Sequence, residues 1–283
     1  MEFVTLNNGV SMPLEGFGVF QVPDPAVCER VVLDAIASGY RLIDTAAAYG
    51  NEEAVGKAVA KCGVPREELF IVTKLWVQDA GYEAAKRAFR TSLEKLGLDC
   101  LDLYLIHQPM GDYIGAYRCL EELYREGKVK AIGVCNCYPH VLADLCETVE
   151  VVPAVNQVEL HPFFQQEDAR KLMEEYGVRP MAWGPLAEGR HGIFTHPVLA
   201  GIGQKYGKTP AQVALRWNVD RGVVIIPKSV HKERMEQNLD IWDFSLSRED
   251  MAEIAGLDIG HSEIVNHYDP AFVKMLHGMK IHG

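Results

Sequence analysis

Polar residues directly follow apolar segments at several places in this sequence, at the points where the strands of an α/β protein would end. Asp44 follows RLI, Lys74 follows FIVT, His107 follows LDLYLI, Asn136 follows AIGVC and Gln157 follows PAVN. In a barrel of parallel strands, functional groups gather at the carboxyl ends of the strands. A carboxylate, an ammonium, an imidazole and amides that meet there indicate either acid–base chemistry or a metal site.

Tyr49 adds a further polar group to this set, five residues after Asp44 on the loop that leads into the next helix. Any one of these residues could simply cap a loop or form a turn. Lys74 is harder to explain in this way, because a lysine directly after a buried strand must be paired or reach water. Asp44 is the available partner. We therefore expect one functional site rather than several unrelated turns.

Short apolar runs rich in β-branched residues alternate with longer amphipathic stretches, which is the pattern of repeated strand–helix units. The expected strands are residues 16–20, 41–44, 70–73, 101–106, 131–134, 154–157, 179–182 and 223–226. Helical spacing of apolar residues marks 26–38, 52–61, 83–96, 115–126, 139–148, 167–176 and 210–219. Helices between successive strands make the strands parallel, and eight such units favour a closed (β/α)8 barrel, the TIM barrel, over an open doubly wound sheet.

Two segments lie outside the repeat. Residues 3–13 centre on Asn7-Asn8-Gly9, which predicts a hairpin that caps the bottom of the barrel. The tail from about 261 to 283 has no clear periodicity and is a candidate loop over the barrel mouth. No linker or shift in composition marks a boundary, so residues 1–283 are expected to form a single domain.

The same positions carry motifs of a known family. They are GYRLIDTAAAYGNE (39–52), IVTKLW (71–76), LYLIHQP (103–109), AIGVCNC (131–137), NQVELHP (156–162) and IIPKS (225–229). Through this set the chain resembles the aldo-keto reductases, from the hairpin to the tail. Trp183 stands where many members have a tyrosine stacked on the nicotinamide, and in this the chain is similar to the bacterial 2,5-diketo-gluconate reductases.

The resemblance implies a catalytic tetrad of Asp44, Tyr49, Lys74 and His107. Carbonyl reduction needs a hydride at carbon and a proton at the oxygen as negative charge develops there. A phenol titrates at about pH 10, so Tyr49 is a reluctant acid, and a nearby ammonium favours its ionised form. Asp44 would then hold Lys74 charged, and His107 would hydrogen-bond the substrate oxygen.

The resemblance also implies NADPH/NADP as the cofactor, although no Rossmann glycine pattern is present. Neither Gly16-Phe17-Gly18 nor Gly201-Ile202-Gly203 has the required spacing. A polar cluster instead follows the eighth strand, where barrels often bind phosphate. The 2′-phosphate of the cofactor would be contacted by Lys228, Ser229 and Arg234, and its adenine by Gln237 and Asn238. The carboxamide of its nicotinamide would be held by Asn136 and Gln157. Trp183, Gly184 and Leu186 complete the expected cofactor contacts. Cys135 replaces the serine that commonly precedes Asn136.

The expected substrate is a small carbonyl compound held by an apolar wall. Phe20, Trp76 and Tyr49 would form this wall, with His267, Tyr268 and Phe272 of the tail closing it. Gln108 stands where the animal aldose reductases carry a tryptophan, and the smaller polar side chain favours a wider pocket for hydroxylated or dicarbonyl substrates.

Two other functions compete with a reductase. A metal-dependent hydrolase would use Glu159, His161, His107 and Asp44 as ligands, but Lys74 at the mouth would repel a divalent cation, so no metal is expected. A non-catalytic NADPH-binding redox sensor, similar to the β-subunits of potassium channels, would share the fold and tetrad. Turnover distinguishes the sensor from an enzyme.

The composition argues against some classes of binding partner. The chain of 283 residues is 48% hydrophobic and carries a net charge of −11, so its surface should repel nucleic acid and anionic lipid. The seven cysteines are scattered, without a C-x-x-C pair, and read as reduced thiols. No signal peptide and no long apolar run is evident. We expect a cytoplasmic protein without nucleic-acid or membrane partners, and a monomer because no heptad repeat demands another copy.

Overall fold

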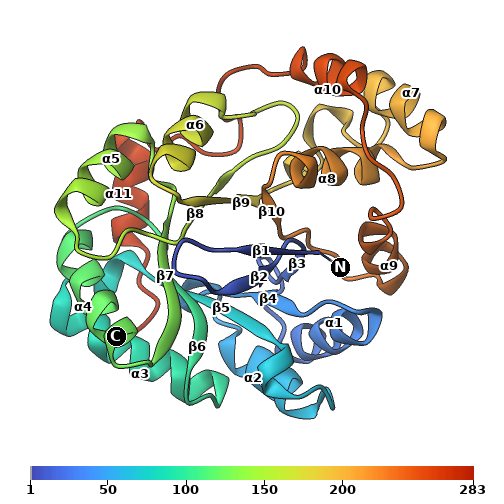
Figure 1. The fold of residues 1–283 in the computed structure, drawn as a ribbon. Coiled ribbons are helices and arrows are strands. Elements are labelled where there is room, and N and C mark those ends of the chain that lie inside the picture. Colours follow the sequence, from blue (N-terminus) through green and yellow to red (C-terminus); the bar gives the residue numbers. More distant parts are fainter. Residues whose placement is uncertain (1) are drawn as a thin grey trace.

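The computed structural model describes residues 2–283 and contains a barrel of parallel strands surrounded by helices (Figure 1). The sheet order is β10-β9-β8-β7-β6-β5-β4-β3. A parallel bridge between Glu15 and Ile225 and a hydrogen bond from Gly18 N to Pro227 O join its two edges. The strands are β3 (Gly16–Gly18), β4 (Leu42–Asp44), β5 (Phe70–Leu75), β6 (Leu101–Ile106), β7 (Val129–Cys135), β8 (Val155–Glu159), β9 (Arg179–Trp183) and β10 (Val224–Ile225). The predicted barrel is confirmed.

The strands read as continuous apolar runs because both of their faces are buried. All six residues of β5 and of β6 are buried, for example. The strand register also sets the height of the site. Gly18 pairs with Asp44 and Asp44 with Val72, which brings Asp44 and Lys74 to the same end of the barrel.

Eleven α-helices within residues 2–283 cover the barrel and its ends. They are α1 (Pro25–Ser38), α2 (Glu52–Lys61), α3 (Tyr82–Leu96), α4 (Tyr113–Arg125), α5 (Pro139–Thr148), α6 (Glu167–Glu175), α7 (Pro197–Tyr206), α8 (Pro210–Asp220), α9 (Lys232–Leu239), α10 (Arg248–Ala255) and α11 (Pro270–Gly278). Seven lie where the apolar spacing predicts them, within a few residues. The other four, α7, α9, α10 and α11, are short and were not predicted. No helix among residues 2–283 is long and apolar enough to cross a membrane.

Helix α1 shows how local sequence sets the boundaries. Asp24 caps its start by accepting a hydrogen bond from Val27 N, and Pro25 occupies the first turn. Gly39 ends it with φ at 119°, a conformation that strains any side chain. The chain then enters β4 at a fixed point, two residues ahead of Asp44.

The opening segment forms the expected hairpin of β1 (Phe3–Thr5) and β2 (Ser11–Pro13). Asn7 Nδ2 donates to Pro153 O at 3.1 Å and Asn8 Nδ2 to Lys130 O at 2.9 Å. Both acceptors lie near the amino ends of β7 and β8, so the hairpin covers the end of the barrel opposite the candidate site.

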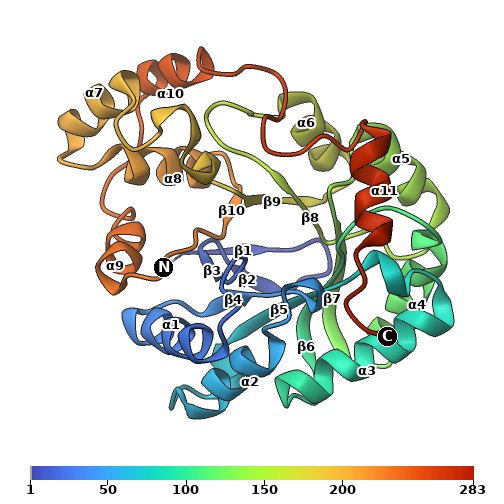
Figure 2. The same cartoon turned by 180° about the vertical axis from the view of Figure 1, so that it is seen from behind.

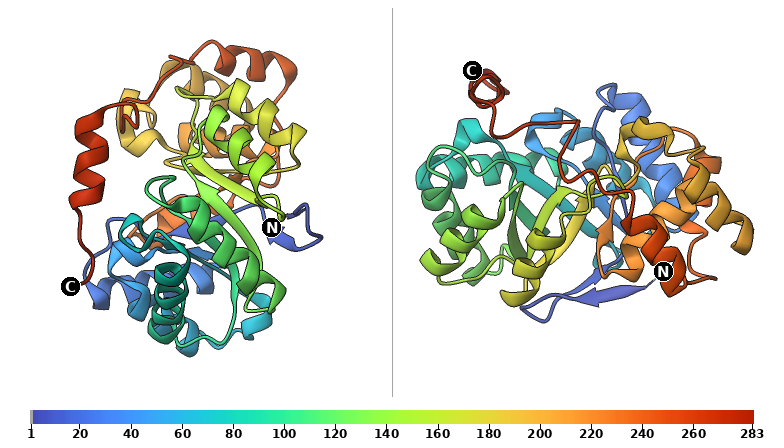
Figure 3. Two further views of the ribbon diagram at one scale, coloured as in Figure 1. Left: turned by 90° about the vertical axis from the view of Figure 1, so that its left-hand side faces the viewer. Right: turned by 90° about the horizontal axis from the view of Figure 1, so that it is seen from above.

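The tail differs from the expected loop, because α11 forms within it (Figure 2) and stands apart from the ring of helices as a separate rod (Figure 3). Asp269 caps α11 by accepting from Ala271 N, and Pro270 begins it. Helix α11 buries Leu276 against Trp76 and Val77, in a small cluster separate from the main core. Phe272, one turn earlier, packs against the same cluster, and two apolar positions are too few to establish a helical period in the sequence.

Candidate active site

Three residues of the expected tetrad meet at the carboxyl ends of β4 and β5. Lys74 Nζ lies 2.5 Å from Asp44 Oδ1, 2.8 Å from Thr45 O and 3.4 Å from the Tyr49 hydroxyl. Tyr49 comes from a short 3-10 helix, Ala47–Tyr49, directly behind β4. Lys74 is fully buried, so its whole donor capacity is directed at this carboxylate, this carbonyl and this phenol.

Burial and charge act against each other in this group. Burial would lower the pKa of Lys74, but the charges of Asp44 and Tyr49 outweigh it and hold that pKa above its usual range. Burial raises the pKa of Tyr49 to about 12, while the Lys74 ammonium opposes the rise. The expected effect of Lys74 on the phenol is therefore present but smaller than the effect of burial. Tyr49 carries its proton at neutral pH and can donate it.

His107 completes the group from the end of β6. Its ring lies edge-on to Tyr49 at 5.5 Å and to Trp76 at 5.3 Å, between ring centroids. Burial, and then the charge of Lys74, lower the pKa of His107 well below its usual range. Within residues 2–283 its Nδ1 atom has no hydrogen-bond partner. A neutral imidazole with one N–H is the species that would donate to a carbonyl oxygen.

The two amides assigned to the nicotinamide lie at the same mouth but already have partners. Gln157 Nε2 donates to Asp44 Oδ2 at 2.9 Å. Asn136, at a positive φ of 57°, donates through Nδ2 to His107 O at 3.1 Å and accepts from Trp183 Nε1 at 2.9 Å. These hydrogen bonds could not be predicted from the sequence, because they join strand ends that are far apart along the chain. The two amides thus hold members of the expected tetrad in place: Gln157 bonds to Asp44, and Asn136 bonds to the backbone of His107.

Beyond Trp183 the chain enters an irregular loop that contains the other expected cofactor contacts. Gly184 adopts a φ of 59°, and Leu186 is half-buried just before the residues Ala187–Gly192. Ala187, Glu188 and His191 have positive φ values although none is a glycine. Such strain persists where the surroundings hold it in place.

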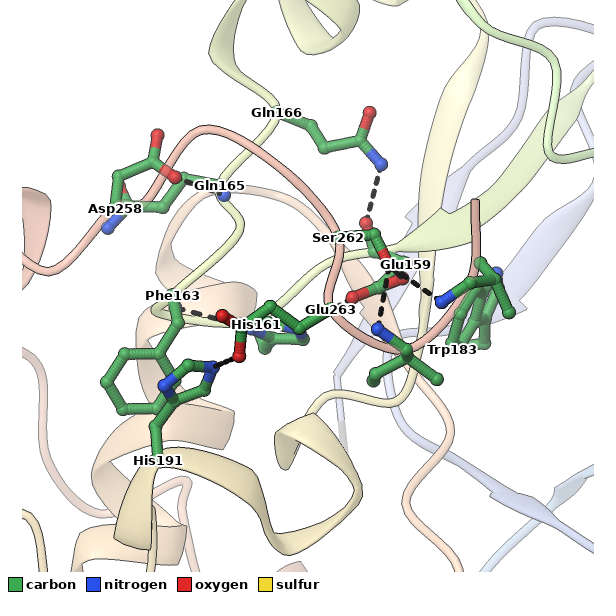
Figure 4. Close-up of polar contacts among 12 residues, drawn as sticks. Glu159, His161, Phe163, Gln165, Gln166, Trp183, His191, Asp258, Ser262 and Glu263 are labelled. Atoms are coloured by element: carbon green, nitrogen blue, oxygen red, sulfur yellow. Dashed lines mark hydrogen bonds and ion pairs between the residues drawn. The ribbon is translucent and has the colours of Figure 1, made fainter. Parts of the chain in front are cut away.

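The tail supplies part of that support (Figure 4). His191 Nε2 lies 3.0 Å from Glu263 Oε2. Ser262 Oγ donates to Glu159 Oε2 at 2.5 Å, and the other oxygen of Glu159 lies 3.0 Å from His161 Nε2. Through the carboxylates of Glu159 and Glu263, the tail is thus held against the end of β8 and the loop that follows β9. No motif marked Ser262 or Glu263 in the sequence.

The polar cluster assigned to the adenosine phosphate surrounds the start of α9. Lys228, Arg234 and Gln237 are exposed, and neither cation forms an ion pair with another of the described residues. Ser229 Oγ accepts from His231 N at 3.1 Å and shapes the turn before the helix. Ser229 and Asn238 differ from the other three residues of the cluster, because both are buried. Free cations beside a helix N-terminus fit a phosphate group.

The expected substrate wall is only partly open. The Phe20 ring is 50% exposed and lies 5.0 Å from that of Tyr49. Trp76 is buried, and its indole N–H donates to Met279 O of the tail at 2.9 Å. Gln108 is buried under His267. Phe20 is thus the exposed side of the expected pocket, and the tail covers Trp76 and Gln108.

The residues of the competing metal site do not converge. Asp44 forms an ion pair with Lys74, and the His107 ring packs against Tyr49 and Trp76. Glu159 and His161 pair with each other. Residues 2–283 contain no group of three or more His, Cys, Asp or Glu side chains placed to hold a metal ion. The geometry favours acid–base chemistry around Tyr49.

Known proteins resemble this chain over most of its length. The model of the Aldo/keto reductase family matches residues 16–259. The glyoxal reductase of Bacillus subtilis is 48% identical over 256 residues, covering 90% of this chain and 92% of that protein. The methylglyoxal reductase DkgA of Escherichia coli is 45% identical over 260 residues, covering 91% and 94%. An aldo-keto reductase of Bombyx mori solved with NADP has a TM-score of 0.89 at 33% identity, covering 94% of this chain and 95% of that one.

Proposed function

This chain belongs to the aldo/keto reductase family, and we propose that it reduces small aldehydes and ketones to alcohols with NADPH, dicarbonyl compounds first among them. The glyoxal and methylglyoxal reductases among its relatives support this substrate class. The complex of the Bombyx mori relative with NADP supports the cofactor.

The observation that carries the proposal is the placement of Lys74 between Asp44 and Tyr49, with the His107 ring edge-on to that of Tyr49. Asp44 would keep Lys74 charged. Lys74 would stabilise the phenolate that remains after Tyr49 gives its proton to the carbonyl oxygen. His107, neutral, would donate its N–H to that oxygen and set its position. NADPH, when bound, supplies the hydride.

The chain also has residues suited to hold both ends of the cofactor. Lys228 and Arg234 are exposed at the start of α9 and have no carboxylate among the described residues to neutralise them, which suits a 2′-phosphate. Ser229 would support the same group and Gln237 the adenine, while the buried Asn238 would reach it only from beneath. At the mouth, Trp183 presents a flat aromatic face for the nicotinamide. Gly184 and Leu186 begin the loop that would cover the cofactor.

Replacement of Tyr49 by phenylalanine tests the proposal. NADPH oxidation with methylglyoxal should fall about 1,000-fold in Tyr49→Phe, because the proton donor is lost while the ring remains. The binding of NADPH, measured by fluorescence quenching, should stay unchanged. Tyr82→Phe is a matched control, since this half-buried tyrosine lies on α3 and its hydroxyl bonds to no other described residue.

Equal activity of the wild type and Tyr49→Phe would contradict the assigned proton donor. Tight binding of NADPH by the wild type without turnover of any aldehyde would favour the redox sensor over the enzyme. A clear preference for NADH would contradict the role given to Arg234.

A further inference from the structure

The loop that carries Tyr49 is closed by a buried hydrogen bond. Thr45, at one end of the loop, donates from Oγ1 to Asn51 Oδ1, at the other end, at 2.7 Å. Both side chains are buried. Between them the backbone makes a tight turn, in which Tyr49 N donates to Ala46 O at 3.0 Å. The phenol thus projects from a short segment whose two ends are joined to each other.

Asn51 also anchors the loop that follows β3. Its Nδ2 atom donates to Val19 O at 3.0 Å and to Val22 O at 3.2 Å. These two carbonyls lie on either side of Phe20 in the chain, and the Phe20 ring packs 5.0 Å from that of Tyr49. One buried amide therefore holds both the loop of the phenol and the loop of the ring beside it.

The side chain of Asn51 is directed at these two loops instead of at its own helix. Asn51 is the N-cap residue of α2, a position at which asparagine ordinarily accepts a hydrogen bond from an N–H group in the first turn. No such bond forms in α2, all of whose residues belong to the described part of the chain. The amide oxygen is bonded to Thr45 instead. The asparagine therefore serves the two loops rather than the stability of the helix start.

Thr45 connects this arrangement to Lys74. The Thr45 N–H donates to Val72 O at 2.9 Å and so continues the pairing of β4 with β5. The Thr45 carbonyl accepts from Lys74 Nζ at 2.8 Å, and the same Nζ lies 3.4 Å from the Tyr49 hydroxyl. The residue that closes the loop of the phenol thus also helps to aim the ammonium at it.

We propose that Thr45 and Asn51 are positioning residues for proton transfer, which hold the Tyr49 hydroxyl where it reaches both Lys74 and the substrate oxygen. The inference rests on the proposed function, in which Tyr49 is the proton donor. A displacement of about 1 Å in a reacting group slows a reaction by about 100-fold. Because both side chains are buried and bonded to protein groups, their loss should lower kcat and leave the binding of NADPH unchanged.

Thr45→Val tests the proposal, because it removes the hydroxyl and keeps the shape of the side chain. We expect kcat with methylglyoxal to fall about tenfold to 100-fold and the Kd for NADPH to stay constant. The solvent isotope effect on kcat, measured in H2O and D2O, should increase, because proton transfer becomes the slow step. Thr45→Ser restores the hydroxyl and should stay within about twofold of the wild type.

Asn51→Ser tests the other end of the loop. Serine caps a helix about as well as asparagine does, so α2 keeps its N-cap. The shorter side chain ends before the atoms that bond to Thr45, Val19 and Val22. We expect kcat to fall by at least as much as in Thr45→Val. The KM for methylglyoxal should rise as well, because Phe20 is no longer held in place.

Thr73→Val is the matched control. Thr73 lies on β5, is equally buried, and donates from Oγ1 to Glu52 Oε1 of α2, also at 2.7 Å. This bond joins the strand to the same helix start but does not close the loop of Tyr49. Its loss should lower the thermal stability by about as much as Thr45→Val does, and should leave kcat and the solvent isotope effect unchanged.

The inference is overturned if folded Thr45→Val keeps the kcat and isotope effect of the wild type, or if Thr45→Ser or Thr73→Val loses as much activity. If Asn51→Ser alone fails to fold, the two Thr45 variants decide. Failure of both Thr45→Val and Asn51→Ser to fold, seen by circular dichroism, would show a purely structural role and overturn the inference too. No turnover by the wild type, or undiminished turnover by Tyr49→Phe, would instead overturn the proposed function, and the inference with it.

Discussion

Glu15 is a buried carboxyl group at the amino end of β3, the opposite end of that strand from the active site. Tyr40 is its neighbour, with the hydroxyl 3.4 Å from Glu15 Oε1, and the other oxygen of Glu15 has no partner within residues 2–283. Burial raises the pKa of Glu15 from 4.5 to about 8, although Tyr40 and Trp242 oppose the rise. The residue is thus protonated in the folded protein at neutral pH.

This residue predicts how stability depends on pH. Between pH 4.5 and about 8 the folded protein keeps a proton that the unfolded chain has released. The free energy of unfolding should therefore fall as pH rises through this window and should recover as pH falls, by about 5 kcal/mol at most from this group. Denaturant unfolding of the wild type and Glu15→Gln at several pH values measures it. An unchanged slope in Glu15→Gln would show that other groups cause the dependence.

At the scale of single residues, part of the active site could be predicted from the sequence and part could not. Asp44, Lys74 and His107 could be chosen because each directly follows an apolar strand, and Tyr49 because it lies in the same family motif as Asp44. The bonds from Gln157 to Asp44 and from Trp183 to Asn136 could not be chosen, because they depend on which strand ends become neighbours in the barrel. Glu15 gave no signal, since a single carboxylate beside a turn is ordinarily exposed.

At the scale of elements, α9 is the part of the chain best suited to select NADPH over NADH. It was not predicted as a helix, because it spans only Lys232–Leu239 and has few apolar residues, although its polar residues were assigned to the cofactor. It is the first helix after β10, and residues 226–231 connect the two. The tail shows the same limit, because two apolar residues one turn apart, Phe272 and Leu276, are too few to establish a helical period in the sequence.

Arg234→Met tests this assignment. We expect the Kd for NADPH to rise about tenfold to 100-fold while the Kd for NADH stays constant, because only NADPH carries the 2′-phosphate that the guanidinium would bind. Arg248→Met, an exposed arginine at the start of α10, is the control and should change neither value. A parallel loss of affinity for both cofactors would place Arg234 elsewhere than at the 2′-phosphate. Titration by fluorescence quenching gives the Kd of each cofactor for the wild type and for both variants.

At the scale of the whole molecule, the net charge of −11 contrasts with the unpaired cations Lys228 and Arg234 at one site. The barrel and its helix layer share one main apolar core, whereas the Trp76 cluster under the tail is separate. The expected monomeric state and cytoplasmic location stay predictions.

The prediction that residues 1–283 are a single domain can be tested by calorimetry. We expect one thermal transition with equal calorimetric and van't Hoff enthalpies, because no strand pair of the barrel can separate without opening the core. Two resolved transitions would show that the chain divides into independent units. NADPH at saturating concentration should shift the single transition upward, since it binds only the folded protein.

The closure of the barrel through Glu15 and Ile225 also has a consequence for synthesis on the ribosome. Strand β3 is made early, yet its second neighbour, β10, emerges only after most of the chain has been translated. Until then β3 is an open sheet edge, available for pairing with other chains. Nascent chains should therefore need protection by chaperones until β10 has left the exit tunnel, and a chain that stops before Val224 should aggregate.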